Sequence, residues 1–218
     1  MLFPHEAPLK VLAEVLADAG LRQFHCAETE KYAHVTHFFN GGREAPFPGE
    51  DREIIPSPPV ATYDLKPEMS AAELADRVIA AIDGGRYDFI LVNFANGDMV
   101  GHTAVIPAIL RAVETLDLPF HRVAQAALAR GFRILLTADH GNCDEMVDPV
   151  SGQPHTQHTA YPVPVLLLGT AAGALGTGRG LADVAPTVLD FLGIAQPPAM
   201  TGCSHVRRET MVAEKDRR

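Results

Sequence analysis

The chain has few cysteines and no excess of basic residues. Three cysteines occur in its 218 residues, and Cys26, Cys143 and Cys203 are far apart. This spacing does not suggest a disulfide framework. Lysine and arginine number 18 against 27 aspartates and glutamates, so the formal net charge is −9. The acidic balance argues against a non-specific binder of nucleic acid or anionic membranes.

A long apolar run is also missing. No stretch approaches the roughly 20 residues that a bilayer span needs, and the N-terminus lacks the basic region and apolar run of a signal peptide. We therefore expect a cytoplasmic protein. Hydrophobic residues make up 47% of the chain, which is enough for a core. At about 150 residues per domain, we expect a single domain over residues 1–206 and a charged, disordered tail over 207–218.

Helix-like and strand-like patterns alternate along the sequence. The expected helices cover residues 7–19, 70–83, 104–130 and 181–192. The expected strands cover residues 21–27, 88–95, 132–137 and 163–168. Apolar strands separated by helices indicate an α/β fold, with a mostly parallel sheet between layers of helices.

Glycine, proline and capping residues refine these expectations. Residues 40–68 contain Gly41-Gly42 and several prolines, which predicts a long connection. Ser70 and Glu73 match the capping-box pattern at the start of a helix. Pro119 is expected to kink or split the helix predicted at 104–130.

Acidic and histidine side chains follow two of the expected strands and precede a third. They are Asp98, His102, Asp139, His140, His155 and His158. In parallel sheets, ligands bind beyond the carboxyl ends of the strands. Carboxylate and imidazole together suit Mn²⁺, Zn²⁺ or Fe²⁺ better than Ca²⁺ or Mg²⁺. The pattern therefore predicts a transition-metal site at one edge of the sheet.

The spacing of these residues refines the prediction. Asp98 and His102 are four residues apart, so on a helical turn they point the same way and can chelate one ion. Asp139 and His140 are adjacent and should point in different directions, which suits two ions or one ion and its neighbour. Two ions about 4 Å apart would serve phosphoryl transfer by clamping the attacking and leaving oxygens. Lys31 could hold a phosphate oxygen if it faces this site.

Each motif also has an ordinary structural explanation. Asp98 and His102 can be a solvated pair, and residues 139–141 can form a turn with a helix cap. Lys31 can be a solvated lysine, and Cys143 can be a small apolar neighbour of the turn. The two later histidines can be loop residues. The shared position at one sheet edge favours the metal site over these alternatives.

A family resemblance rests on segments that follow one another along nearly the whole chain. They are residues 27–36, 38–42, 56–58, 60–70, 93–103, 137–142, 155–159, 162–164 and 183–202. On these residues the chain resembles the cofactor-independent (2,3-bisphosphoglycerate-independent) phosphoglycerate mutases of the alkaline phosphatase superfamily. It resembles the C-terminal part of their phosphatase-like domain.

The resemblance implies two divalent ions, usually Mn²⁺, although Zn²⁺, Fe²⁺ and Co²⁺ accept the same ligands. One ion would be held by Asp98, His102 and His158. The other would be held by Asp139 and His140, together with an aspartate and a nucleophilic serine that no segment here matches. The first site would then be complete and the second partial.

The resemblance also implies an activity. In the family, the serine takes the phosphate from one glycerate hydroxyl and returns it to the other, which interconverts 3- and 2-phosphoglycerate in glycolysis. Lys31 would lie by that serine and steady the phosphate. Family members are considerably longer, and their substrate-binding phosphotransferase domain is not matched either. We therefore expect the chain to be inactive alone, with an exposed sheet edge that invites self-association or a partner chain.

Three functions stay open on the sequence. The chain can be the metal-binding half of a phosphoglycerate mutase that works when the other half is supplied. It can be a stand-alone hydrolase of phosphate esters, in which a metal-bound hydroxide replaces the serine. It can also be a remnant that binds metal without turnover.

Overall fold

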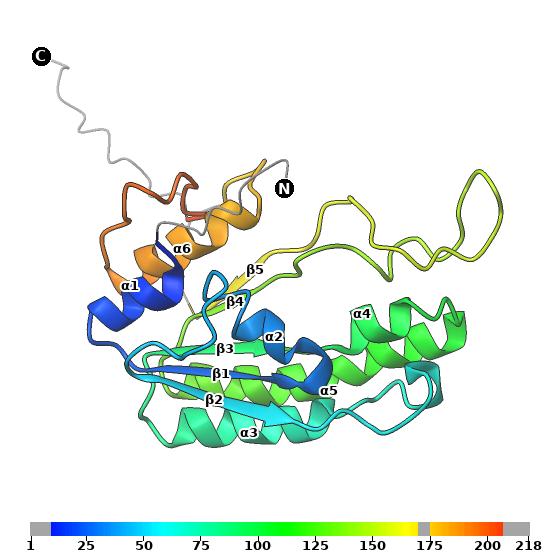
Figure 1. Ribbon diagram of the computed structural model, residues 1–218, viewed down its shortest axis with the longest axis horizontal. Coiled ribbons are helices and arrows are strands. Elements are labelled where there is room, and N and C mark those ends of the chain that lie inside the picture. The colour runs from blue at the N-terminus through cyan, green and yellow to red at the C-terminus, as the bar shows by residue number, and fades with distance from the viewer. Residues whose placement is uncertain (1–9, 170–174, 207–218) are drawn as a thin grey trace, which may run out of the picture.

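The computed structural model describes residues 10–169 and 175–206 (Figure 1). Its helices are α1 Leu12–Asp18, α2 Tyr32–Val35, α3 Ala71–Asp83, α4 Asn96–Gly101, α5 Ile106–Ala129 and α6 Val184–Leu192. Its strands are β1 Gln23–Glu28, β2 Glu50–Ile55, β3 Phe89–Asn93, β4 Ile134–Leu136 and β5 Leu166–Leu168. Short 3₁₀ turns are η1 Thr29–Lys31, η2 Tyr63–Leu65 and η3 Leu181–Asp183. The tail expected over 207–218 lies outside the described residues.

Three strands form a parallel sheet in the order β2-β1-β3. In the register of this sheet, Gln23 of β1 lies between Glu50 of β2 and Phe89 of β3. The central strand β1 is buried along its whole length. The parallel sheet predicted from apolar strands is confirmed for β1 and β3, and helices lie on both of its sides (Figure 1).

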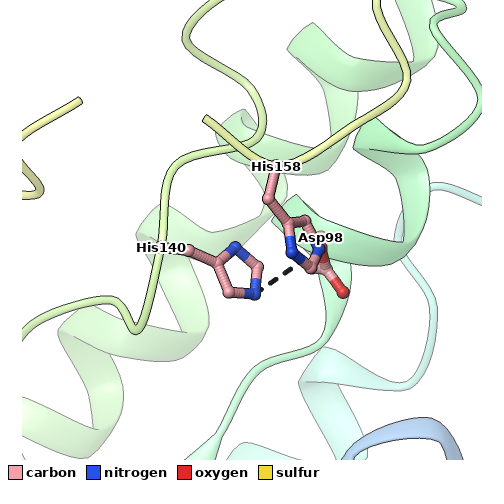
Figure 2. Close-up of side chains that lie close together, drawn as sticks. All are labelled: Asp98, His140 and His158. Carbon is pink, nitrogen blue, oxygen red and sulfur yellow. Dashed lines mark hydrogen bonds and ion pairs between the residues drawn. The ribbon is translucent and has the colours of Figure 1, made fainter. Parts of the chain in front are cut away.

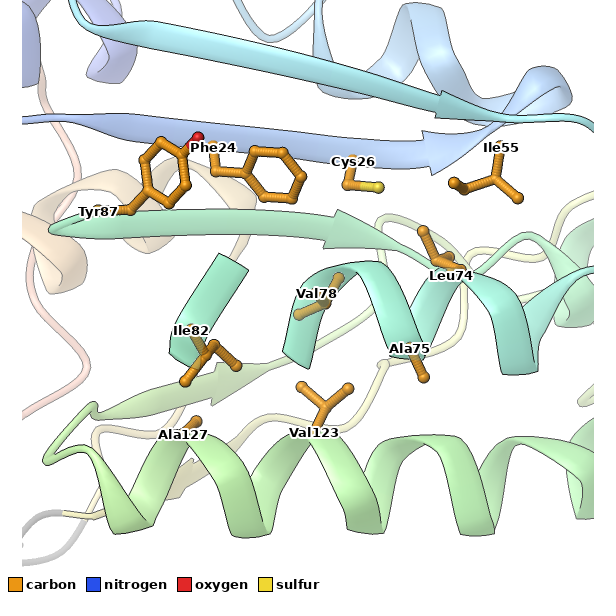
Figure 3. Packing of buried hydrophobic residues seen from close by; sticks show 10 residues of the cluster. All are labelled: Phe24, Cys26, Ile55, Leu74, Ala75, Val78, Ile82, Tyr87, Val123 and Ala127. Carbon is orange, nitrogen blue, oxygen red and sulfur yellow. The ribbon is translucent and has the colours of Figure 1, made fainter. Parts of the chain in front are cut away.

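The main core lies between this sheet and the helices α3 and α5 (Figure 3). Phe24 and Cys26 of β1 face Leu74 and Val78 of α3, and Val123 of α5 closes the cluster. Leu74 and Val78 are four residues apart and therefore share one face of α3. Burying one such aliphatic side chain stabilises the fold by roughly 1.5–3 kcal/mol.

The opposite face of β1 carries polar side chains. Gln23 donates from its amide nitrogen to the carbonyl oxygen of Ala13 in α1, at 2.7 Å. The Nδ1 atom of His25 lies 2.7 Å from the carbonyl oxygen of Val35 in α2. These two hydrogen bonds tie α1 and α2 to the sheet and satisfy groups that would be costly to bury alone.

The connection expected over residues 40–68 is wrong in part, because it contains β2. Two features explain why the sequence pattern did not predict this strand. Glu50 and Arg52 are polar, yet Glu50 is buried and accepts hydrogen bonds from Asn40, at 2.8 Å, and from Arg52, at 2.6 Å. Within the described part of the chain β2 pairs with β1 alone, through main-chain hydrogen bonds that do not depend on the side-chain pattern.

The helix expected over residues 70–83 is present as α3, but the capping box is not. The Oγ atom of Ser70 donates to the carbonyl oxygen of Pro56, at 2.8 Å, and no side chain caps the helix. Glu28, at the end of β1, instead accepts hydrogen bonds from Ser70 and Ser57. The carboxyl group of Glu28 thus links the end of β1 to the start of α3.

Two further expectations for the second half of the chain are corrected. Pro119 does not split the predicted helix, because α5 runs unbroken from Ile106 to Ala129. β4 and β5 are antiparallel, with Ile134 opposite Leu168, rather than parallel as expected. No helix connects β4 to β5. A parallel pair needs a crossover connection, usually a helix, whereas an antiparallel pair needs only a connection that reverses the chain direction.

We call residues 137–165, which connect β4 to β5, the arm. Its two sides run together away from the sheet and pass near α4 (Figure 1). Gly141 pairs with Thr159, and Val147 pairs with Pro154 near the tip. The arm brings residues from both of its sides to α4.

The last helix agrees with its prediction over residues 181–192. It comprises η3 and α6, and Gly193 ends it in the left-handed conformation, with φ of 70°. Leu189 of α6 packs against Leu16 of α1. Among the described residues, no helix has the length and hydropathy that crossing a membrane requires.

Candidate metal site

Helix α4 begins just after β3 and carries the first two candidate ligands. The side-chain amide of Asn96 donates to the carbonyl oxygens of Pro67 and Glu68, at 2.8 and 2.9 Å, and so fixes the start of the helix. Asp98 and His102 follow one turn apart. The Oδ1 atom of Asp98 lies 3.1 Å from the Nε2 atom of His102. The two side chains therefore point the same way, as their spacing predicts.

The arm brings His158 to the same point. Its Nε2 atom lies 2.9 Å from Oδ1 of Asp98 and 3.1 Å from Nε2 of His102. Ligand atoms that share one ion at about 2.1 Å lie roughly 3.0–3.4 Å apart. One carboxylate oxygen and two imidazole nitrogens are thus arranged closely enough for a single divalent ion.

A hydrogen bond fixes the tautomer of His102. Its Nδ1 atom lies 2.7 Å from the carbonyl oxygen of Thr156, which can only accept. Nδ1 therefore carries a proton, and Nε2 is the ring nitrogen left to bind an ion. Carbonyl oxygens hold metal-binding histidines in this manner in many proteins.

His140 lies against the same cluster (Figure 2). Its ring stacks on that of His158, with centroids 3.5 Å apart, and its Nε2 atom lies 4.0 Å from Oδ1 of Asp98. Asp98, His140 and His158 offer ligand atoms that all lie within 4.8 Å of one another. His140 is therefore within reach of the ion that the resemblance gives to Asp98, His102 and His158.

Asp139 lies beside His140. Its Oδ2 atom is 3.5 Å from Nε2 of His140, so the ends of these adjacent side chains converge rather than diverge as expected. Half of the Asp139 side chain is exposed. The assignment of this pair to a second ion stays a prediction.

Lys31 enters the site from η1, at the end of β1. Its side chain is 7% exposed and forms an ion pair with Oδ2 of Asp98, so it is not the solvated lysine of the alternative explanation. Burial acts to raise the pKa of Asp98, but hydrogen bonds from Lys31 and Asn142 hold that pKa well below its usual range. Asp98 is consequently a carboxylate at neutral pH, as a metal ligand must be.

Asn142 is a site residue that sequence reasoning missed. Its Nδ2 atom donates to Oδ1 of Asp98, at 2.7 Å, and to the carbonyl oxygen of Asp98, at 3.2 Å. The only signal in the sequence is its place directly after Asp139-His140-Gly141. An asparagine in a turn has many ordinary roles, so position alone does not reveal a contact with Asp98.

Cys143 is a neighbour of the cluster and not part of it. Its Sγ atom donates to the carbonyl oxygen of Gly97, at 2.9 Å. Burial raises the pKa of the Cys143 thiol to about 11. The thiol therefore stays protonated at neutral pH, and the expectation that this cysteine is a bystander fits its geometry.

An open pocket of about 290 Å³ adjoins His158. It is lined by Glu145, His155, His158, Thr159, Ala160 and Tyr161. The Nδ1 atom of His155 lies 3.1 Å from the carbonyl oxygen of Glu145, and its ring belongs to the pocket rather than to the cluster around Asp98.

The chain matches the family described as Metalloenzyme superfamily over residues 3–196. It therefore belongs to the metalloenzyme superfamily. The cluster of carboxylate and imidazole groups at Asp98 is in keeping with that membership, because these groups together suit divalent transition metals.

Curated relatives show which group of metalloenzymes this chain is similar to. A relative from Chloroflexus aurantiacus, named 2,3-bisphosphoglycerate-independent phosphoglycerate mutase, is 56% identical over 94% of this chain. Relatives of the same name from Rhodopseudomonas palustris and Thermomicrobium roseum are 55% and 57% identical. The chain spans only 39% of the length of the Chloroflexus aurantiacus relative. The resemblance to this group of mutases is thus confirmed, over part of their length.

Solved structures agree with this placement. A phosphoglycerate mutase of Leishmania mexicana, crystallised at low cobalt concentration, has a TM-score of 0.82 and 34% identity. The match covers 89% of this chain and 38% of that one. A 2-O GAG sulfatase has a TM-score of 0.57 at 13% identity and covers 90% of this chain and 55% of its own, which shows a shared fold alone. The expected alkaline-phosphatase-like α/β fold is confirmed.

Proposed function

We propose that this chain supplies the metal-binding part of a cofactor-independent phosphoglycerate mutase, which interconverts 3- and 2-phosphoglycerate in glycolysis. The observation that carries the proposal is the 56% identity to a relative of that name over nearly the whole chain. The convergence of Asp98, His102 and His158 supports it, because phosphoryl transfer in metalloenzymes requires a preformed cation site. A glycolytic role would place the protein in the cytoplasm.

The proposed roles combine the geometry with the family resemblance. Asp98, His102 and His158 would hold one divalent ion, and Asp139 and His140 would contribute to a second. Bound divalent ions would supply positive charge that stabilises the phosphoryl group during transfer. We propose Mn²⁺ as the ion, with Zn²⁺, Fe²⁺ and Co²⁺ as the alternatives that the same ligands accept.

Lys31 would act on the phosphate rather than on the metal. Its ammonium group is held within the site by its ion pair with Oδ2 of Asp98. A buried lysine at this point would offer a positive charge to a phosphate oxygen next to the ion. Its burial favours that role over a solvated surface position, since only 7% of the side chain is exposed.

The sheet edges support a proposal about partners. β3 is apolar over Phe89–Val92 but only half-buried, and among the described residues it pairs with β1 alone. β4 pairs with β5 alone within the same described part of the chain, and it too is half-buried. We propose that a further strand pairs at the edge of β3, from the rest of a full-length mutase or from a second copy of the chain.

Complementation tests this function. The chain is mixed with the remainder of the Chloroflexus aurantiacus relative, prepared separately, in the presence of Mn²⁺. We expect conversion of 3- to 2-phosphoglycerate by the mixture and none by either part. The variant His158→Ala should abolish the recovered activity, whereas His155→Ala, on the same arm, should leave most of it.

Two results would contradict the proposal. Hydrolysis of p-nitrophenyl phosphate by the chain alone with Mn²⁺, lost in Asp98→Ala, would indicate a stand-alone hydrolase. Metal binding without turnover, at any ratio of the two parts, would indicate a remnant that binds metal.

A further inference from the structure

Asp98 is held through both of its carboxylate oxygens. Oδ2 pairs with Lys31, while Oδ1 accepts a hydrogen bond from Asn142, at 2.7 Å, and faces His102 and His158. Asn142 is 5% exposed, so this hydrogen bond is shielded from water. The oxygen that Asn142 contacts is therefore the same oxygen that the two histidines approach.

The neighbours of Asn142 fix the orientation of its amide. Nδ2 contacts two acceptors, Oδ1 and the carbonyl oxygen of Asp98. A flipped amide would place its own oxygen against both, and three acceptors would repel one another. Oδ1 of Asn142 is buried, with no hydrogen-bond partner among the described residues, and lies against Gly101. The only hydrogen bonds that hold the side chain here, among the described residues, are therefore those that its Nδ2 atom donates.

Gly101 provides the space for that side chain. A Cβ atom at Gly101 would lie 2.4 Å from Oδ1 and 2.7 Å from Cγ of Asn142. Separations this short do not occur, so an alanine at 101 must displace Asn142. The contrast is Gly97 in the same helix, where a Cβ atom would meet only Sγ of Cys143, at an ordinary 3.8 Å.

We propose that Asn142 is a positioning residue of the metal site and that Gly101 is needed to admit it. The inference rests on the proposed function, since it concerns the ligand role of Asp98. The hydrogen bond from Asn142 occupies one lone pair of Oδ1 and directs the other toward His102 and His158. With Oδ2 held by Lys31, Asp98 presents one oxygen to the ion in one orientation.

The hydrogen bond between Asn142 and Asp98 also holds the arm against α4. Asn142 lies on the arm and Asp98 on α4, so the hydrogen bond joins the two segments that carry the candidate ligands. Next to it, Thr159 donates to Asp144, at 2.7 Å, across the start of the arm. A Cβ atom at Gly141 would lie 2.2 Å from both side chains, so this glycine lets the arm close there.

Cobalt binding to the whole 218-residue chain tests the proposal. The dissociation constant is measured by calorimetry, and the visible absorption of Co²⁺ reports the geometry of its ligands. We expect Asn142→Ala and Gly101→Ala each to weaken Co²⁺ binding by about 10–100-fold and to change the spectrum. Gly97→Ala should bind as the unchanged chain does.

The double variant separates positioning from a general loss of structure. Once Asn142 is alanine, the atoms that a methyl group at 101 would meet are gone. Gly101→Ala should then cost nothing further, so the double variant should match Asn142→Ala in affinity and spectrum. Circular dichroism establishes whether each variant is folded. If Gly101→Ala alone is not folded, the test is the comparison of the double variant with Asn142→Ala.

Other results would overturn the proposal. Unchanged Co²⁺ affinity and spectrum in Asn142→Ala would remove the positioning role while leaving the proposed function intact. An equal loss from Gly101→Ala in both backgrounds would remove the link between the two residues. Failure of the unchanged chain itself to bind Co²⁺ would remove the metal site, and the positioning role with it.

Discussion

The Nδ1 atom of His102 lies 2.7 Å from the carbonyl oxygen of Thr156, and this contact joins helix α4 to the arm. Thr156 is two residues before His158, so the hydrogen bond that sets the tautomer of one candidate ligand also positions the next. The candidate ligands therefore come from α4 and the arm, two segments that are distant in the sequence and are brought together by folding. An ion bound between them would link α4 and the arm further.

Metal binding should therefore stabilise the folded chain. At about 100 times the dissociation constant, Mn²⁺ or Co²⁺ is expected to raise the free energy of unfolding by about 2.7 kcal/mol. Thermal unfolding with and without the ion measures this. His158→Ala should lose most of the effect, because its Nε2 atom lies 2.9 Å from Oδ1 of Asp98. The control is His155→Ala, and a similar loss in that variant would place the ion elsewhere.

Replacing Lys31 should affect stability and metal affinity in opposite directions. Lys31→Met removes the charged partner of Oδ2 of Asp98 while keeping the length and apolar stem of the side chain. The metal-free chain should lose about 1.5–3 kcal/mol, since a nearly buried carboxylate loses a charged hydrogen bond. Affinity for Mn²⁺ should rise, because a competing positive charge is gone while the hydrogen bond from Asn142 still orients Oδ1 of Asp98.

Calorimetric titration with Mn²⁺ and denaturant unfolding give the two quantities for Lys31→Met. Lys66→Met is the control, since Lys66 is exposed and lies outside the site. Lower Mn²⁺ affinity in Lys31→Met would show that the lysine supports the ion instead of competing with it.

The sequence indicates the candidate ligands but not their arrangement. The spacing of Asp98 and His102 predicts one shared face of a helix, and α4 provides it. His140 and His158 meet through the arm, whose path depends on pairs such as Gly141 with Thr159, formed across 18 residues of chain. Patterns of three to four residues carry no information on such pairs. This is why the stacking of His140 on His158 could not be predicted.

The strands show the same division. β3 is apolar and half-buried, so its composition predicts it, whereas the buried strand β1 mixes apolar residues with Gln23, His25 and Glu28. β2 has four charged residues in six and is held by its pairing with β1, and Glu50 is satisfied by Asn40 from another segment. β4 and β5 are apolar as predicted, but composition does not report strand direction. The direction depends on the connection, and the arm contains no crossover helix.

Glu28 should make stability depend on pH. Burial raises the pKa of this carboxyl group, and hydrogen bonds from Ser70 and Ser57 offset the effect only in part. Because the folded-state pKa exceeds the unfolded value of about 4.5, the folded chain binds this proton more tightly. Its contribution to stability is full below that pH and is lost as pH rises through the folded-state pKa.

Glu28→Gln should therefore be more stable than the unchanged chain at pH 7, by about 1 kcal/mol, and similar to it at pH 4. Urea unfolding at several pH values measures the difference. Glu114→Gln is the control, because Glu114 is an exposed acid on α5, away from Glu28. A difference that is the same at pH 4 and pH 7 would show that the charge of Glu28 is not its cause.

The three cysteines should react with a thiol reagent at different rates. Cys203 is exposed, whereas Cys26 is buried and Cys143 is partly buried. Burial raises the pKa of Cys26 to about 12 and that of Cys143 to about 11. At pH 8 a thiol with a pKa near 11 is ionised in only about one molecule in a thousand, and the thiolate is the reactive form. We expect one fast thiol per folded chain and three in urea.

The variants Cys203→Ser and Cys143→Ser assign the fast reaction. Cys203→Ser should abolish it in the folded chain, and Cys143→Ser should leave it unchanged, because the Sγ atom of Cys143 is held against the carbonyl oxygen of Gly97. Absorbance with a chromogenic disulfide follows the reaction. A fast phase that persists in Cys203→Ser and disappears in Cys143→Ser would show that the arm opens from α4 on the time scale of the assay.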